Sequence, residues 1–291
     1  MKALAEFIMA GRLKASLVAC LGNLLPFVSP AAVALVTLRK SYADAFIVTL
    51  WAVLPLVAML KVAGDKVSEA DGLMVWAALL SVPVVVLSAL VLRASASWSR
   101  TLLAIIGASI LLALAVKVVL AAKLEAVRGV LLEMLKQIGE QEQGISLMFS
   151  DLFLAGLLAW AMALMAVVAL LLGRWWQALL YNPGGFQKEF HALRMQKGVA
   201  MALLAGLSAC YLLPQDYFTW GNVLGLPLLL SGIALVHHVV TFAQLGGHWL
   251  VIFYFGLILL IGPLSTVLVG LGFLDSMLDL RARFAARKSD S

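Results

Sequence analysis

Long apolar runs recur along this chain, and short clusters of basic residues separate them. An α-helix needs about 20 apolar residues to cross the hydrocarbon core of a bilayer. Hydrophobic residues make up 64% of the sequence and charged residues 12%, whereas soluble domains average about 45–50% and about 25%. The pattern predicts a polytopic integral membrane protein. Because the runs are continuous rather than alternating with period two, an all-α helical bundle is favoured over a β-barrel.

About eight apolar segments fit transmembrane helices, and no hydrophilic segment is long enough to fold separately. We therefore expect a single membrane domain that comprises residues 1–291. The expected spans are 16–38, 43–63, 73–92, 101–122, 149–173, 198–213, 221–243 and 249–274. The first contains Asn23, Pro26 and Pro30, so it is either one kinked span or two half-length helices hinged at the prolines.

Several segments between the spans suit the membrane–water interface. Residues 2–14 are expected to form an amphipathic lead-in, and 123–144 an amphipathic helix with apolar residues at three- and four-residue spacing. Residues 275–291 form a basic tail in which Asp275 and Asp279 could pair with arginines one turn on. Asp151 follows Ser150 at the start of another helix, where we expect it to be a cap stabilised by the helix dipole.

Residues 174–197 mix aromatic and basic side chains around a Pro-Gly-Gly turn. Such a mixture is typical of lipid headgroups, where aromatic rings and long cations both find partners. We expect an interfacial hairpin with Arg174, Trp175 and Trp176 as anchors at the end of one helix. In the second arm we expect Phe186 and Phe190 to be buried anchors, while His191 and Arg194 are solvated.

The orientation can be tested by counting Lys and Arg on each side of the membrane. If 16–38 is one span, the side of the two termini carries 13 and the other side eight, which favours cytoplasmic termini. If this segment is a hairpin, the counts become 11 and ten. The one-span alternative is preferred, although it places Arg39, Lys40 and the 174–197 stretch outside.

Motifs of common enzymes are missing from the sequence. It contains no GxxxxGK[ST] loop, no HExxH, no CxxC and no GxSxG. We therefore expect no enzyme, no catalytic residue, no metal site and no cofactor. The net charge of +6 lies in short clusters between apolar runs, which indicates membrane topology and lipid contact rather than nucleic-acid binding. Cys20 and Cys210 both lie within apolar runs and do not indicate disulfides.

The strongest polar feature inside an apolar run is SGIALVHHVVTFAQLGGH. His237, Thr241 and Gln244 have i, i+4, i+7 spacing, which places them on one helix face. Polar groups at membrane depth often line ligand sites, and Asn23, beside a proline-broken helix, is a further candidate. The alternative is that His237 and His238 hydrogen-bond between helices.

Two stripes of small residues repeat every four positions. They are Ala155, Ala159, Ala163 and Ala202, Gly206, Cys210. Small residues let neighbouring helices approach closely, either within the bundle or at a docking surface for another membrane protein.

Three segments together resemble the YybS-like family of uncharacterised bacterial inner-membrane proteins. They are LLPFVSPAAVALVTLRKSYADAF, RWWQALLYNPGGFQKEFHALR and GLGFLDSMLDLRARF. That family is distantly similar to the S components of energy-coupling factor transporters, small helical bundles that bind a solute and borrow a separate membrane subunit and ATPases. This chain has Ser41 where S components commonly show Gly.

Taken with the missing nucleotide-binding loop, the resemblance implies a substrate-capture subunit in the bacterial inner membrane. It would bind or move an unknown small solute and would depend on other membrane subunits and a separate ATPase. The alternative is a non-transporting scaffold or assembly factor that contacts other membrane proteins.

Overall fold

The structure is a computed structural model that describes residues 1–25, 27–63, 69–137 and 150–289. Every regular element in these ranges is a helix, so the all-α class is confirmed. Where a single domain was expected, the contacts divide the chain into two compact units. Unit 1 comprises Met1–Pro183 with Cys210–Val223, and unit 2 comprises Gly184–Ala209 with Leu224–Ser291.

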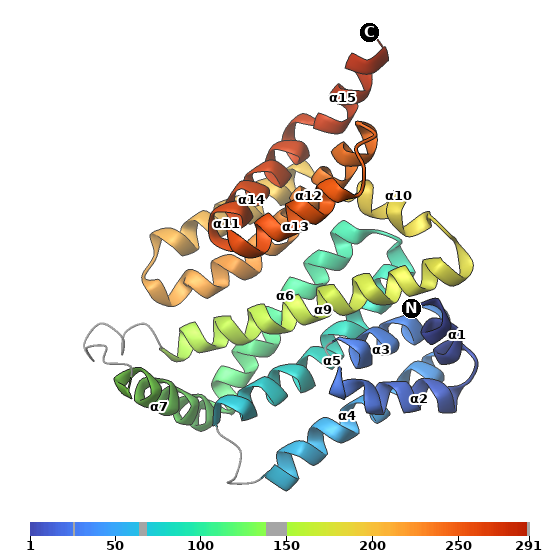
Figure 1. The fold of residues 1–291 in the computed structure, drawn as a ribbon. Helices are drawn as coiled ribbons and strands as arrows, with labels where there is room; N and C mark the ends of the chain where they lie inside the picture. Colours follow the sequence, from blue (N-terminus) through green and yellow to red (C-terminus); the bar gives the residue numbers. More distant parts are fainter. Residues whose placement is uncertain (26, 64–68, 138–149, 290–291) are drawn as a thin grey trace. The chain divides into compact units, whose positions relative to one another are not determined.

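Unit 1 is organised around one long helix, α9, which packs against α3, α5 and α6 (Figure 1). Its side chains Ala155, Ala159 and Ala163 are fully buried, so this small-residue stripe serves internal packing. The helices of unit 1 are α1 (Lys2–Met9), α2 (Arg12–Leu21), α3 (Val28–Arg39), α4 (Tyr42–Ala63), α5 (Glu69–Ser95), α6 (Trp98–Val119), α7 (Ala121–Gln137) and α9 (Asp151–Tyr181). The residue that caps α9 is Ser150 rather than Asp151, because the hydroxyl of Ser150 accepts a hydrogen bond from the backbone N–H of Phe153.

Unit 2 contains a close crossing of two helices, α12 and α14. A Cβ added at Gly232 would lie 2.0 Å from the carbonyl oxygen of Leu268, and one added at Gly272 would lie 2.1 Å from that of Leu228. Only glycine permits this backbone-to-backbone approach. The helices of this part of the chain are α10 (Gly185–His191), α11 (Lys197–Leu212), α12 (Phe218–Phe242), α13 (His248–Leu259), α14 (Ile261–Leu278) and α15 (Leu280–Ser289).

Among the described residues, six helices are long and apolar enough to cross a membrane. They are Tyr42–Val62, Val75–Ser95, Trp98–Val119, Asp151–Tyr181, Gln215–Phe242 and Ile261–Leu278. The protein is therefore a multi-pass membrane protein, but the expected count of eight spans is not confirmed. Three further apolar helices, α3, α11 and α13, are shorter.

The expected span 16–38 is not one helix but two half-length helices. α2 ends at Leu21, and the chain reverses into α3 so sharply that a Cβ on Gly22 would lie 2.9 Å from the backbone nitrogen of Ser29. The hydroxyl of Ser29 donates to the carbonyl of Ala19 at 2.6 Å. Pro30 lies in the first turn of α3, where a missing N–H costs nothing. The preferred one-span alternative is therefore corrected in favour of the hairpin; Pro26 lies outside the described residues.

The expected span 249–274 is also divided. Leu260, with φ −119° and ψ 44°, separates α13 from α14. The 12 residues of α13 rise only about 18 Å, against about 30 Å of hydrocarbon. α13 therefore does not cross a bilayer by itself.

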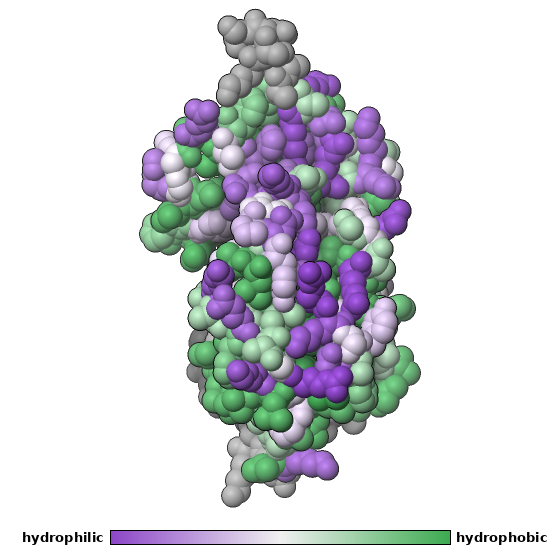
Figure 2. Space-filling model, turned by 90° about the vertical axis from the view of Figure 1, so that its right-hand side faces the viewer, coloured by the Kyte–Doolittle hydropathy of each residue, from purple (hydrophilic) through white to green (hydrophobic). Residues whose placement is uncertain are grey.

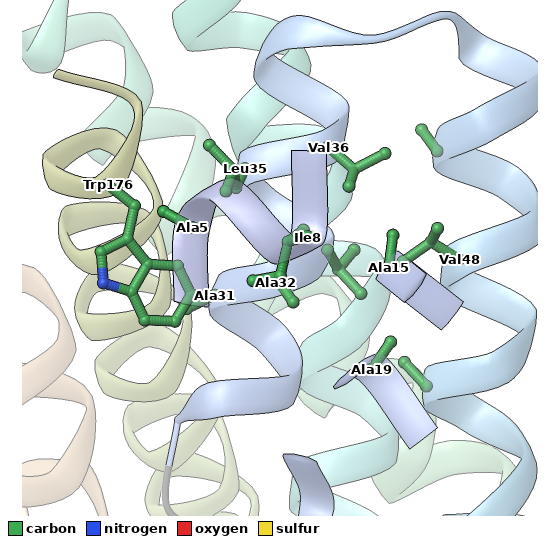
Figure 3. Close-up of a cluster of buried hydrophobic side chains, with 13 residues drawn as sticks. Ala5, Ile8, Ala15, Ala19, Ala31, Ala32, Leu35, Val36, Val48 and Trp176 are labelled. Atoms are coloured by element: carbon green, nitrogen blue, oxygen red, sulfur yellow. The ribbon is translucent and has the colours of Figure 1, made fainter. Parts of the chain in front are cut away.

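The lead-in 2–14 is not a surface helix. Ala5 and Ile8 of α1 are fully buried in the core of unit 1, where the indole of Trp176 lies beside Ala5 and Ala31 (Figure 3). A break at Gly11 then starts α2. The amphipathic α7 has Leu124 and Val127 buried, as its spacing predicts, while residues 138–144 of the expected helix lie outside the described ranges.

Residues 174–197 comprise the end of α9, a turn, α10 and the start of α11. Gly184 has φ 80°, a left-handed conformation that favours glycine. α10 follows at Gly185, and a short connection from Ala192 leads to α11. The tail expected at 275–291 begins inside α14, and Asp279, with φ 50°, separates it from α15.

Candidate functional site

Three half-buried histidines gather in unit 2. His191 ends α10, and His237 and His238 lie near the end of α12. The ring centroid of His191 lies 6.1 Å from that of His237 and 6.3 Å from that of His238. We call His191, His237 and His238 the histidine cluster.

Aromatic rings surround the histidine cluster. The ring of Phe190 meets His237 edge-on, with centroids 5.3 Å apart, and Phe242 stacks on His238 at 6.1 Å. Nε2 of His237 lies 2.8 Å from the hydroxyl of Tyr254 in α13. Three helices thus contribute to a site with apolar walls and a few polar atoms, the usual composition of a small-molecule site.

Arg281 of α15 fixes the end of α10. Its Nη1 donates to the carbonyl of His191, and its Nη2 donates to the carbonyl of Leu193 at 2.7 Å. His191 is the last residue of α10, and Leu193 lies in the connection that follows it; a carbonyl at a helix end has no partner within the helix. The guanidinium therefore positions His191 by completing the hydrogen bonds of its backbone.

Two ion pairs hold the same region. Nε of Arg281 lies 3.0 Å from a carboxylate oxygen of the fully buried Asp275, six residues earlier rather than the one turn that was expected. Asp279 instead pairs with Arg194 at 2.6 Å, so Arg194 is not simply solvated. Together the pairs join the connection after α10 to the junction of α14 and α15.

His191 is biased toward its neutral form. Burial lowers its pKa, and the neighbouring His237, His238 and Arg281 lower it further. The pKa of Asp279 is also lowered, because its carboxylate accepts a hydrogen bond from Arg194. A neutral imidazole offers one N–H donor and one acceptor nitrogen, so His191 can hydrogen-bond a polar ligand without bringing a charge.

The expected common face of His237, Thr241 and Gln244 is not formed. α12 ends at Phe242, and Gln244 follows in a left-handed conformation with φ 55°. Thr241 and Gln244 are both exposed. The alternative interpretation, a hydrogen bond between helices, describes His237 correctly, because Tyr254 belongs to α13.

Asn23 belongs to unit 1 and has a structural role there. Its amide nitrogen lies 3.0 Å from the carbonyl of Ala52, 3.2 Å from that of Ala19 and 3.3 Å from that of Cys20. It therefore ties the end of α2 to α4.

The expected anchors of the hairpin differ from one another. Trp176 is 1% exposed within the core of unit 1, so its ring does not reach headgroups, while Trp175 is half-buried and Arg174 donates to Gln177. Phe186 stacks on the buried Phe190 with centroids 5.9 Å apart. These two rings form the inner side of α10, as expected.

His191 was expected to be solvated and is instead part of the histidine cluster. Its neighbours Lys188 and Glu189 suggest a wet surface, whereas the contacts that bury it come from α12 and α15. Its position directly after the buried Phe190 was the one local signal. Within the described residues, no group of three or more His, Cys, Asp or Glu side chains could hold a metal ion.

Comparison with protein-family models, with curated proteins and with solved structures finds no match.

Proposed function

We propose that this membrane protein binds a small solute at the histidine cluster and acts as a substrate-capture subunit without an ATPase of its own. The observation that carries the proposal is the convergence of His191, His237 and His238, with the ring centroid of His191 6.1 Å and 6.3 Å from those of the other two, beside the ring of Phe190. We further propose that it lies in the bacterial inner membrane and belongs with the YybS-like proteins that it resembles.

The support extends beyond the three imidazoles. Packing alone would not require Arg281 and the buried Asp275 to fix the α10 terminus that carries His191. Asp275 is fully buried, and burying a charged group is costly unless it is paired, as Asp275 is with Arg281. A precisely held terminus is what a binding site needs, because preorganised groups lose less entropy on binding.

The test is native mass spectrometry of the full chain purified in detergent from its own cells. We expect a bound small molecule on the wild-type protein and its loss in His191→Gln and His238→Gln. His248→Gln is the matched control, since His248 is exposed at the start of α13. Retention of the same molecule in all three variants would place binding elsewhere, and a wild-type protein without a ligand would contradict capture.

The substrate-capture role also predicts partners. A tagged protein should co-purify with a second membrane subunit and an ATPase. The variants His191→Gln and His238→Gln should still form this complex. Recovery of a bound solute without these partners would retain binding and contradict the dependence on an ATPase.

The alternative is a scaffold that contacts other membrane proteins. One observation favours it: α13 has no buried residue, and Val251, Ile252, Phe255 and Ile258 are all more than half exposed. Lipid can cover this face as well as protein can. Phe255→Ala combined with Ile258→Ala should break a defined complex on native gels if the face docks a partner, and should leave solute binding unchanged.

A further inference from the structure

One end of unit 1 collects basic residues from several helices. Arg12 at the start of α2 pairs with Asp44 near the start of α4. Nη1 of Arg93, near the end of α5, donates to the carbonyl of Thr37 at 3.1 Å and to that of Lys40 at 2.6 Å. The starts of α2 and α4 and the ends of α3 and α5 therefore meet, and we call this end of unit 1 the basic rim.

The charge of unit 1 is distributed unevenly. The basic rim has eight basic residues, Lys2, Arg12, Lys14, Arg39, Lys40, Arg93, Arg100 and Arg174, and two acidic ones, Glu6 and Asp44. At the opposite end, the charged side chains that the structure describes are three basic ones, Lys61, Lys117 and Arg128, and four acidic ones, Glu125, Glu133, Asp151 and Asp216. The rim is therefore strongly positive, and the described side chains of the opposite end are close to neutral.

Neutral partners hold several of the rim cations and do not cancel their charge. The guanidinium of Arg39 lies 4.4 Å from the ring centroid of Tyr181, and that of Arg93 lies 5.3 Å from the ring of Tyr42. Tyr42 is 69% exposed and Tyr181 47%. Exposed tyrosines beside cations are typical of the headgroup level, where one side of the ring is apolar and the hydroxyl is wet.

An apolar surface follows the rim along α4. Phe46 is 64% exposed and Leu50 is 51% exposed, one and two turns after Tyr42. Figure 2 looks onto the rim, where hydrophilic side chains gather between hydrophobic flanks. A positive, tyrosine-bearing edge above an apolar belt is the arrangement of a membrane–water boundary.

We propose that the basic rim binds the phosphate headgroups of anionic phospholipids and therefore faces the cytoplasm. Basic residues near the ends of membrane spans are enriched on that side, and clustered Lys and Arg attract anionic lipid there. This inference does not depend on the histidine cluster.

The hairpin of α2 and α3 supports this orientation, because the near-even count expected for a hairpin also took 249–274 as one span, and the structure divides that segment at Leu260. The hairpin places the N-terminal cations on the same side as Arg39 and Lys40, whereas one span across 16–38 would separate them. Unit 2, considered by itself, has the same asymmetry. Its described basic side chains, Lys188, Arg194, Lys197, Arg281 and Arg283, all belong to the elements that Arg281 and Arg194 join. The described chain around its opposite end, at Leu260, has no Lys, Arg, Asp or Glu from 245 to 274.

Lipid binding is tested by melting the full chain in detergent with phosphatidylglycerol or with phosphatidylcholine. Phosphatidylglycerol should raise the Tm of the wild-type protein more than phosphatidylcholine does, and Arg39→Gln with Lys40→Gln should lose at least half of that gain. Lys61→Gln with Lys117→Gln is the matched control at the opposite end and should keep the gain.

Each other outcome of this experiment contradicts the proposal. Equal gains in both variants would mean that the rim is not the lipid site. A gain reproduced by inorganic phosphate alone would mean that the rim binds free anions and not headgroups. Should the double rim variant fail to fold, the single variant Lys14→Gln, at an exposed position, replaces it.

Orientation is tested in intact cells with a membrane-impermeant maleimide, in a background with Cys20→Ser and Cys210→Ser. Ala43→Cys lies at the rim, and Val62→Cys lies at the opposite end of the same helix; both positions are exposed. We expect labelling of Val62→Cys in intact cells and of Ala43→Cys only after permeabilisation. Labelling of Ala43→Cys in intact cells would overturn the orientation.

Discussion

Nε of Arg281 lies 3.0 Å from a carboxylate oxygen of Asp275, whose side chain is 0% exposed. The other two nitrogens of this guanidinium donate to the carbonyls of His191, at the end of α10, and of Leu193, just after it. A single buried acid thus supports the arginine that positions His191. Asp279, one turn away, is engaged by Arg194 instead.

Asp275→Asn should destabilise unit 2 strongly. The substitution would leave the buried charge of Arg281 without its anionic partner. Breaking a buried ion pair in this way typically costs about 3–5 kcal/mol. Asp279→Asn is the matched control, because its pair with Arg194 is partly exposed and should be worth about 0–1 kcal/mol. Equilibrium unfolding in detergent measures both. An equal decrease in the free energy of unfolding in both variants would mean that the buried pair of Asp275 stabilises the protein no more than the partly exposed pair of Asp279.

Gly272→Ala should weaken the crossing of α12 and α14. The added methyl would meet the backbone oxygen of Leu228, which cannot rotate away, and overpacking of this kind costs about 1–3 kcal/mol. Gly270→Ala lies in the same helix with nothing within 4 Å. It should instead stabilise the helix by about 0.5–1 kcal/mol. If Gly272→Ala and Gly270→Ala shift the melting temperature in the same direction, the close crossing of α12 and α14 is contradicted.

Ile8→Ala tests whether α1 belongs to the core. Ile8 is fully buried against the core of unit 1, so the loss of its side chain should cost about 2–5 kcal/mol. Leu13→Ala, at a position that is 87% exposed, should change the free energy of unfolding by no more than about 0.5 kcal/mol. A surface helix lying on lipid would instead give small effects at both positions.

Acidification should destabilise the protein through His191. Its folded pKa lies below the unfolded value, which is near 6.5, so at lower pH the unfolded state binds more protons and the free energy of unfolding falls. This loss begins as the pH drops below about 6.5. His191→Gln should reduce the dependence of Tm on pH between 7.5 and 5.5, whereas His248→Gln should leave it unchanged. An unchanged slope in His191→Gln would contradict the burial of a neutral imidazole.

Hydropathy was sufficient to predict the helical membrane class, because every long apolar run forms helix. Hydropathy could not locate the break between α2 and α3 or the break at Leu260 between α13 and α14. Pro30 and Pro263 both lie in the first turn of a helix, at α3 and α14, where proline is well tolerated. Pro55, Pro83 and Pro227, however, lie inside continuous helices. Proline inside an apolar run therefore does not by itself distinguish a kink from a helix start.

The candidate site was predicted only in part. His237 was identified from its depth in an apolar run, but Thr241 and Gln244 were added by assuming that α12 continues past Phe242. His191 was missed because its burial comes from residues distant in the sequence. Local periodicity reports which face a helix presents, and it does not report which distant helix covers that face.

The bonds of Arg281 also have a consequence for biosynthesis. The donor to both carbonyls, Arg281, lies 90 residues after His191 and 88 residues after Leu193 in the chain. Translation proceeds at about 5–20 residues per second, so roughly 5–18 s pass between the synthesis of α10 and that of Arg281. During this time the two carbonyls lack their donor. A chain released before Arg281 would therefore contain every histidine of the cluster and would lack the side chain that positions His191.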